Sequence, residues 1–235
     1  MDRAALFDVD GTLVDSNALH VVAWWEGLRQ GGHHVPTHAV HRAIGLPGEK
    51  LLEHLLGPDR DRSEDERLSA AHDTLYGTWF ERLQAFDGAA DLLRTLAGSG
   101  WKVVLVTSAK DRELEALRAA VDADDAISAT ATADDVEEGK PAPDPIEHAL
   151  SLVGVAPERA VLVGDSVWDM KAARHAGVVC VGLLCGGIPR TDLKDAGAAA
   201  VYDDATDLLD HLGTGPFATV GQASTGGQPS GRSSG

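Results

Sequence analysis

Short apolar runs alternate with amphipathic segments along most of this 235-residue chain. After an apolar run at 4–9, the alternation resumes near residue 90 and continues to 212. Strands that alternate with helices predict a parallel sheet with helices on both faces. We therefore expect an α/β fold. The expected segments are helices ADLLRTLA, DRELEALRAA, PIEHALSLVG, VWDMKAARHAG and ATDLLDHL, and strands WKVVLVTS, AISATA, RAVLVGDS, VVCVGLL and AAAVY.

The stretch between the first strand and residue 88 has helical patches and no clear strand pattern. Its first segment, 16–30, predicts a helix that buries Leu19, Val22, Ala23 and Leu28, with Ser16 as a plausible N-cap. We expect three parts: a sheet core made of 1–15 and 88–212, an all-helical insertion at 16–87, and a Gly/Ser/Thr-rich disordered tail at 213–235.

Charge and cysteine content narrow the partners and the compartment. The formal net charge of -17 opposes binding to nucleic acid or to an anionic membrane surface, and a phosphorylated ligand would need local cations. No apolar run approaches the roughly 18 residues of a membrane span, and no basic-then-apolar signal opens the chain. Cys180 and Cys185 lack a second pair of metal ligands nearby, so we expect two unpaired thiols and a cytoplasmic protein.

Chemically capable residues cluster at four places where the predicted strands end or the following loop begins. Ligands of open α/β sheets bind beyond the carboxyl ends of the strands. Asp8 and Asp10 are the most unusual pair, because two close carboxylates repel each other unless a cation or proton intervenes. The residues at the four places are Asp8, Asp10 and Thr12; Thr107 and Ser108; Lys140; and Asp165 with Asp169.

Taken together, four motifs resemble those of the haloacid dehalogenase superfamily. They are D-x-D-G-T at 8–12, a strand-ending Thr107, K-P-x-P-D at 140–144 and G-D-S-x-x-D at 164–169. The resemblance covers residues 4–212 and is strongest to the subfamily with a helical cap after the first strand, which includes phosphoglycolate phosphatases and β-phosphoglucomutases. It implies a Rossmann-like parallel-sheet core with an inserted all-helical cap.

The resemblance also implies roles for the residues at the strand ends. Asp8 would attack phosphorus and form an aspartyl-phosphate, and Asp10 would act as general acid and base. Thr107, the backbone N–H of Ser108, and Lys140 would bind the phosphoryl oxygens.

Further residues are expected to bind substrate and metal. Thr12 and Ser108 are candidate substrate contacts, and so is His20, which lies where mutase relatives have a hinge histidine. A buried or solvated histidine without a catalytic role is the alternative for His20. A magnesium ion would take side-chain oxygens of Asp8 and Asp165 and the backbone carbonyl of Asp10, with Asp169 holding the metal's water molecules.

Departures from the family patterns separate possible reactions. Dehalogenase members lack the second aspartate of the first motif, so Asp10 disfavours carbon–halogen cleavage. Sugar phosphomutases have an acidic residue where this chain has Gly164 and a small residue where it has Asp169. Mutases also carry a lysine and an arginine at the cap positions that match Ile44 and Gly48, although Lys50 is close by.

The leading hypothesis is therefore a magnesium-dependent phosphatase of a small phosphorylated metabolite, for example phosphoglycolate or a sugar phosphate. A sugar phosphomutase and a catalytically silent binding module on the same scaffold are the alternatives. Silence is disfavoured because Asp8, Asp10, Lys140 and Asp165 are all retained. The expected state is a monomer or homodimer that binds neither nucleic acid nor membrane.

Overall fold

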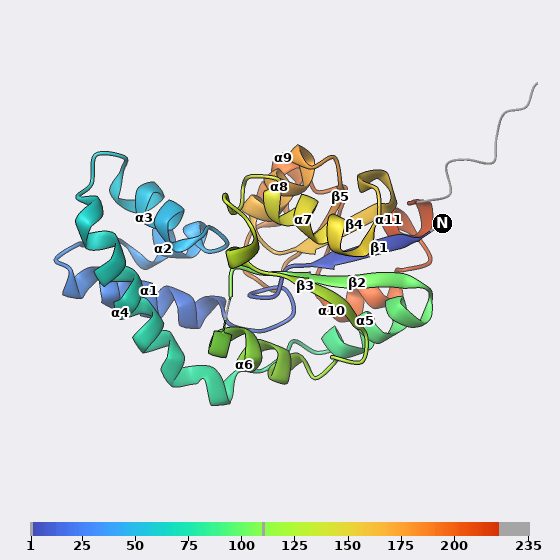
Figure 1. The fold of residues 1–235 in the computed structure, drawn as a ribbon, viewed down its shortest axis with the longest axis horizontal. Coiled ribbons are helices and arrows are strands. Elements are labelled where there is room, and N and C mark those ends of the chain that lie inside the picture. The colour runs from blue at the N-terminus through green and yellow to red at the C-terminus, as the bar shows by residue number, and fades with distance from the viewer. Residues whose placement is uncertain (1, 110, 221–235) are drawn as a thin grey trace, which may run out of the picture.

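A computed structural model describes residues 2–109 and 111–220, and its centre is a six-stranded sheet with the order β3-β2-β1-β4-β5-β6 (Figure 1). All five strand pairings are parallel. This confirms the predicted fold class. The strands are β1 Arg3–Phe7, β2 Trp101–Val106, β3 Ile127–Ala131, β4 Ala160–Gly164, β5 Val179–Leu183 and β6 Ala200–Tyr202.

Helices cover both faces of the sheet because successive strand residues point to opposite sides. In β1, Ala5 and Phe7 join one apolar cluster, while Ala4 and Leu6 join the other. The first face is covered by α5 (Ala89–Gly98), α6 (Asp111–Val121), α10 (Ala205–Asp210) and α11 (Gly215–Thr219). The second face is covered by α7 (Asp144–Val153), α8 (Val167–His175) and α9 (Arg190–Ala196). Two 3-10 helices, η3 (Ala133–Asp135) and η4 (Pro157–Arg159), lie in the connections before α7 and β4.

A separate layer of helices, the helical insertion, follows β1 and stands beside the sheet (Figure 1). It has its own apolar cluster, which includes Trp24, Leu28, Leu52 and Leu68. Because the insertion buries its own apolar side chains, its helices can pack together without a large contact with the sheet. Its elements are α1 (Asn17–Gln30), α2 (Thr37–Ala43), α3 (Gly48–Leu56), η1 (Arg62–Glu64), α4 (Asp65–Tyr76) and η2 (Gly77–Arg82).

Two details of α1 differ from the sequence-based expectation. Val22 is 48% exposed, whereas Val21, Trp24 and Leu28 are buried, because the apolar face follows their spacing of three and four residues. Ser16 precedes the helix but its side chain makes no capping hydrogen bond. Its hydroxyl donates instead to Asp10 Oδ1 at 2.6 Å.

Part of the segment predicted to be a disordered tail is a helix. Residues 215–219 form α11, and Phe217 is buried against Trp101 with ring centroids 5.0 Å apart. Pro216, Phe217 and Val220 are buried, so this segment packs on the core although its composition indicated disorder. The remainder, 221–235, lies outside the described residues. Both cysteines are free, as expected, and within the described ranges no helix is long and apolar enough to cross a membrane.

Candidate active site

The strand order places two of the predicted aspartates side by side. The chain leaves β1 for β2 and β3 on one side, then returns to β4 on the other, so β1 and β4 are neighbours. Ligand sites of open α/β sheets form at such a reversal of strand order. Asp8 follows β1 and donates its backbone N–H to Val163 at 2.9 Å, and Asp165 follows β4 directly.

Three buried carboxylates surround one buried lysine at this position. Lys140 forms ion pairs with Asp8 and, at 2.7 Å, with Asp169 Oδ1. Asp8, Asp165 and Asp169 have carboxylate oxygens within 4.8 Å of one another, and each residue is at most 8% exposed. The predicted members of the site therefore meet, although they are up to 161 positions apart in the chain.

Electrostatics in this cluster follow from burial and from an excess of negative charge. Burial, together with the charges of Asp169 and Asp165, raises the pKa of Asp8 well above its usual range despite Lys140. Burial and Asp169 raise the pKa of Asp165 to about 7. For Lys140, burial acts in the opposite direction, but Asp169 and Asp8 raise its pKa above the ordinary lysine value.

These carboxylates fit a hard divalent cation. Three acids share one buried lysine, so a further positive charge is needed to keep all of them ionised. Carboxylate oxygens are the ligands that Mg²⁺ prefers. Polar neighbours hold Asp165 in place: Thr12 donates to Oδ1 at 2.9 Å and Asn17 donates to Oδ2 at 2.8 Å. The cluster can thus hold a metal ion.

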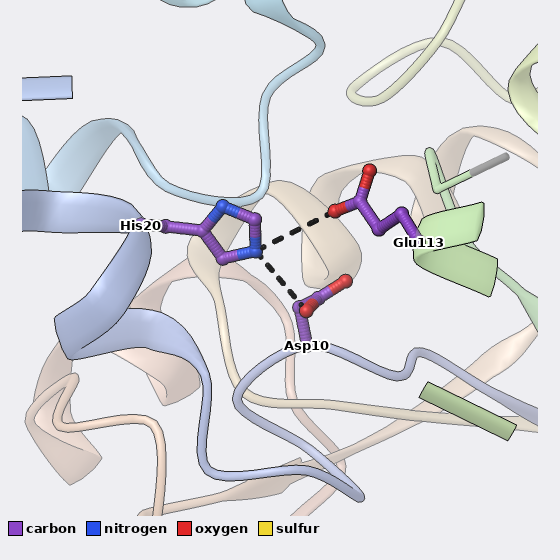
Figure 2. Close-up of side chains that lie close together, drawn as sticks. All are labelled: Asp10, His20 and Glu113. Carbon is purple, nitrogen blue, oxygen red and sulfur yellow. Dashed lines mark hydrogen bonds and ion pairs between the residues drawn. The ribbon is translucent and has the colours of Figure 1, made fainter. Parts of the chain in front are cut away.

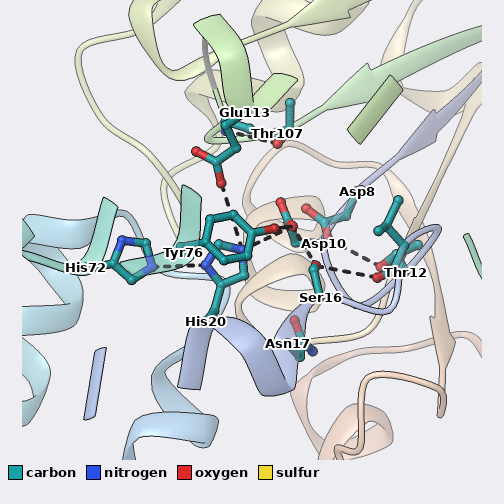
Figure 3. A network of polar contacts seen from close by, with 12 residues as sticks. Asp8, Asp10, Thr12, Ser16, Asn17, His20, His72, Tyr76, Thr107 and Glu113 are labelled. Carbon is teal, nitrogen blue, oxygen red and sulfur yellow. Dashed lines mark hydrogen bonds and ion pairs between the residues drawn. The ribbon is translucent and has the colours of Figure 1, made fainter. Parts of the chain in front are cut away.

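Asp10 lies in a different network (Figures 2 and 3). Its Oδ1 is 3.1 Å from His20 Nε2 and 3.5 Å from the Tyr76 hydroxyl, which donates to it. Glu113 Oε1 approaches the same His20 nitrogen at 3.9 Å. Burial would raise the pKa of Asp10, but hydrogen bonds from His20 and Ser16 lower it below the usual value.

Behind His20, a line of polar groups runs into the helical insertion (Figure 3). His20 Nδ1 is 3.0 Å from His72 Nε2, and His72 Nδ1 is 2.8 Å from Asp73 Oδ1. His20 also stacks on Tyr76, with ring centroids 3.8 Å apart. The contacts on both ring nitrogens fix the orientation of His20 toward Asp10.

A cavity of about 620 Å³ opens between the helical insertion and the ends of the strands. Asp8, Asp10 and Asp165 line it from the sheet, and His20 and Ile44 line it from the insertion. The cavity is large enough for a small metabolite. Reactive groups and a ligand space therefore coincide.

The remaining predicted residues divide into two groups. Thr107, Ser108 and Lys140 line the cavity, and Thr107 Oγ1 accepts from the backbone N–H of Ala109 at 3.0 Å, which leaves its own hydrogen for a ligand. Thr12 is fully buried, is not among the described residues that line the cavity, and contacts Asp8 and Asp165 instead. Asp169 also lies behind the cavity, where it pairs with Lys140 and accepts from Ser166.

Sequence reasoning missed Asn17, Tyr76 and Glu113. The structure shows what Gly11 does for Asn17: Gly11 has φ +74°, and a Cβ there would lie 2.2 Å from Asn17 Nδ2. The glycine of D-x-D-G-T thus makes room for the side chain that holds Asp165. Glu113 looked like an ordinary acid in the first turn of a helix, and Tyr76 like an ordinary core aromatic.

Comparison with known proteins agrees with this geometry. A family model described as haloacid dehalogenase-like hydrolase matches residues 3–177. The chain belongs to this family. The predicted family and the prediction of a hydrolase are confirmed.

Named relatives extend over nearly the whole chain. A phosphoglycolate phosphatase of Nitrosococcus oceani is 28% identical over 215 residues, 88% of this chain and 95% of that protein. A validoxylamine A 7'-phosphate phosphatase of Streptomyces hygroscopicus subsp. limoneus is 30% identical over 205 residues, 86% and 92% of the two chains. The crystal structure of a hydrolase from Pseudomonas syringae superposes with a TM-score of 0.85 at 36% identity, over 90% and 98% of the two chains.

Proposed function

We propose that this protein is a magnesium-dependent phosphatase that hydrolyses a small phosphomonoester through an aspartyl-phosphate at Asp8. The observation that carries the proposal is the meeting of Asp8, Lys140 and Asp165 at the floor of one cavity, with Asp10 at its side. The relatives named above as phosphatases support the same reaction class. A silent module would not need these groups together.

In the first half-reaction, an Asp8 carboxylate oxygen attacks phosphorus and the bond to the leaving oxygen breaks. A carboxylate is ionised at neutral pH when a cation balances it, so it needs no separate base to activate it. Lys140, the Thr107 hydroxyl and the backbone N–H of Ser108 bind the phosphoryl oxygens as charge develops on them.

Asp10 carries protons in both half-reactions. It gives a proton to the leaving oxygen, and it later takes one from the water that attacks the aspartyl-phosphate. The hydrogen bond from His20 aims the Asp10 carboxylate and lowers its pKa, so the free group is ready to act as the base. Burial lowers the pKa of His20, but the hydrogen bond to Asp10 and the charge of Asp10 raise it above its usual value, so the His20 imidazolium would supply the proton that Asp10 passes to the leaving oxygen.

Asp8 and Asp165, with the backbone carbonyl of Asp10, would hold the magnesium ion. When bound, the ion would neutralise the carboxylates and the substrate phosphate against the net charge of -17. Asp169 acts on this site through Lys140, which it holds beside Asp8.

The helical insertion would serve as a cap domain, residues 16–87, over a catalytic core made of 1–15 and 88–212. Its wall disfavours a phosphomutase. Ile44 and Gly48 line the cavity where a mutase has cations. Lys50 Nζ is 2.9 Å from Glu138 and 3.2 Å from the Gly139 carbonyl, so this lysine joins the cap to the core.

A screen of phosphorylated metabolites tests the proposed function. Phosphate release is measured with magnesium and with a chelator, and p-nitrophenyl phosphate serves as a general substrate. Metal-dependent release from at least one compound is expected. No release from any compound, with a folded protein, would exclude the phosphatase.

A further inference from the structure

Acidic side chains dominate the part of the cavity beyond the catalytic floor. Apart from Asp8, Asp10 and Asp165, the acids among its described lining residues are Glu49, Asp73, Asp111 and Glu113. The lysine and arginine side chains among the same residues are those of Lys140 and Arg112. Lys140 is already paired with Asp8 and Asp169. Among the described lining residues beyond the catalytic floor, acids therefore outnumber lysines and arginines, and His20 and His72 are the histidines beside them.

Glu113 lies near the reacting atoms, because its carboxylate is within 4.8 Å of Asp10 and of His20. It reaches from the first turn of α6 toward the cavity, and its Oε1 lies 3.9 Å from the His20 nitrogen that contacts Asp10 (Figure 2). Its side chain is 24% exposed. If Asp10 protonates the leaving oxygen, the substituent next to that oxygen would lie on the side of the cavity where Glu113 stands. Burial, and after it the charge of Asp10, raises the pKa of Glu113 to about 7, whereas His20 acts in the opposite direction.

Arg112 does not balance these acids next to the reacting atoms. It is an exposed residue at the rim and also lines a separate shallow depression with Glu115 and Phe80. An exposed guanidinium is screened by water and salt, so it acts weakly on a group near Asp10. The half-buried Glu113 is screened less.

Much of the remaining wall is apolar or aromatic. Such a surface suits the C–H faces of a compact, hydroxylated carbon skeleton better than a second anion, which would lose hydration without gaining a partner. The apolar and aromatic lining residues include Trp24, Ile44, Leu46, Leu51, Tyr76 and Phe80.

We infer that the site selects phosphomonoesters whose leaving group is neutral or cationic beside the scissile oxygen, and that Glu113 is the residue that rejects anionic leaving groups. This inference rests on the proposed phosphatase activity and names its substrate class. A hydroxyl or an ammonium group can donate a hydrogen bond to Glu113, whereas a carboxylate meets a like charge.

Three two-carbon phosphomonoesters test this choice because they differ only in the terminal group. They are phosphoethanolamine, 2-hydroxyethyl phosphate and 2-phosphoglycolate, which carry an ammonium, a hydroxyl and a carboxylate. Each is measured at pH 8 with magnesium, both by phosphate release and as a competitor of p-nitrophenyl phosphate. The competition arm gives an order of affinity even where turnover is slow.

2-Phosphoglycolate should be the poorest ligand, by about tenfold or more in kcat/KM or inhibition constant. This is the effect expected for like charges a few ångströms apart in a partly buried site. Glu113→Gln should raise kcat/KM for 2-phosphoglycolate and lower it for phosphoethanolamine. The difference in kcat/KM between the two compounds should therefore shrink by about the same factor. Glu115→Gln makes the same chemical change on an exposed position of α6 and should leave the order unchanged.

Preference for 2-phosphoglycolate in the wild type would overturn the inference and leave the phosphatase proposal intact. An unchanged order in Glu113→Gln would overturn the role of Glu113. No phosphate release from any compound, including p-nitrophenyl phosphate, would instead exclude the proposed function, and the inference with it.

Discussion

A Cβ atom on Gly164 would lie 2.5 Å from the Cγ of Asp169, closer than real Cβ contacts come. Asp169 is 1% exposed and holds Lys140, so it cannot move aside without loss of that ion pair. The two positions therefore compete for one space. This explains physically why an acid at the Gly164 position accompanies a small residue at the Asp169 position in mutases, and why this chain has the reverse pair.

Gly164→Glu alone should destabilise the fold, because overpacking a filled interior costs roughly 1–3 kcal/mol. Adding Asp169→Ala to Gly164→Glu should recover part of the lost melting temperature, since one carboxylate again occupies the space. Thermal unfolding of the two variants and the wild type checks this. A wild-type melting temperature for Gly164→Glu would contradict the steric argument.

Asp8→Asn should abolish turnover and keep the fold. The amide preserves the shape of the side chain at the end of β1 but cannot form the aspartyl-phosphate. Phosphate release and circular dichroism are the measurements. Activity within tenfold of the wild type would rule out the covalent mechanism.

Asp10→Asn should slow both half-reactions, by roughly 10²–10⁴-fold for a lost general acid–base group. With p-nitrophenyl phosphate, whose leaving group needs no proton, formation of the aspartyl-phosphate should remain fast while its hydrolysis stays slow. A burst of p-nitrophenol followed by slow steady-state release is the expected trace. A wild-type steady-state rate on this substrate would show that Asp10 is not the base.

Magnesium should raise the melting temperature of the wild type, because a ligand that binds only the folded state stabilises it. Asp165→Asn should lose most of this shift, since it removes a charged oxygen donor from the buried cluster. Asp192→Asn is a matched control, because Asp192 pairs with Arg42 on the surface, away from the cluster. Equal shifts in both variants would place the metal elsewhere.

The features that could be predicted from the sequence are those that depend on neighbouring residues. The alternation of strands with helices predicted the parallel sheet, and the acids that follow the strands predicted that Asp8 and Asp165 lie at the same edge of it. The partners of Asp10 were harder to predict. Ser16 could equally have capped α1, and nothing local distinguishes Glu113 from Glu115 until α6 is packed beside the insertion.

Two predictions were wrong because they depend on long-range packing: the buried face of α1 and the start of the C-terminal tail. Several apolar residues of α1 could have formed its buried face. In the packed insertion, Val21 and Trp24 are buried and Val22 is exposed. Phe217 lies in a segment of low apolar content, and it is buried in the core cluster that includes Trp101, 116 positions earlier. Contacts at such separations leave no periodic trace in the sequence.

Water rather than a second hydroxyl should accept the phosphoryl group. A mutase must grip the second phosphate of a bisphosphate intermediate with cap cations. Here Ile44 and Gly48 line the cavity, and Lys50 is tied to Glu138 and Gly139 at the seam between insertion and sheet. Incubation with β-glucose 1-phosphate, its 1,6-bisphosphate and magnesium should therefore yield no glucose 6-phosphate.

A double substitution sharpens that test. Ile44→Lys with Gly48→Arg supplies the missing cations, and any gain in isomerisation by this variant would support the argument that the cap charge decides the acceptor. Lys50→Ala is the control, because it removes the contact of Lys50 with Glu138 and Gly139 without adding charge to the cavity. Efficient isomerisation by the wild type without phosphate release would overturn the hydrolase proposal, yet it would leave Asp8 as the nucleophile, since both reactions need the same aspartyl-phosphate.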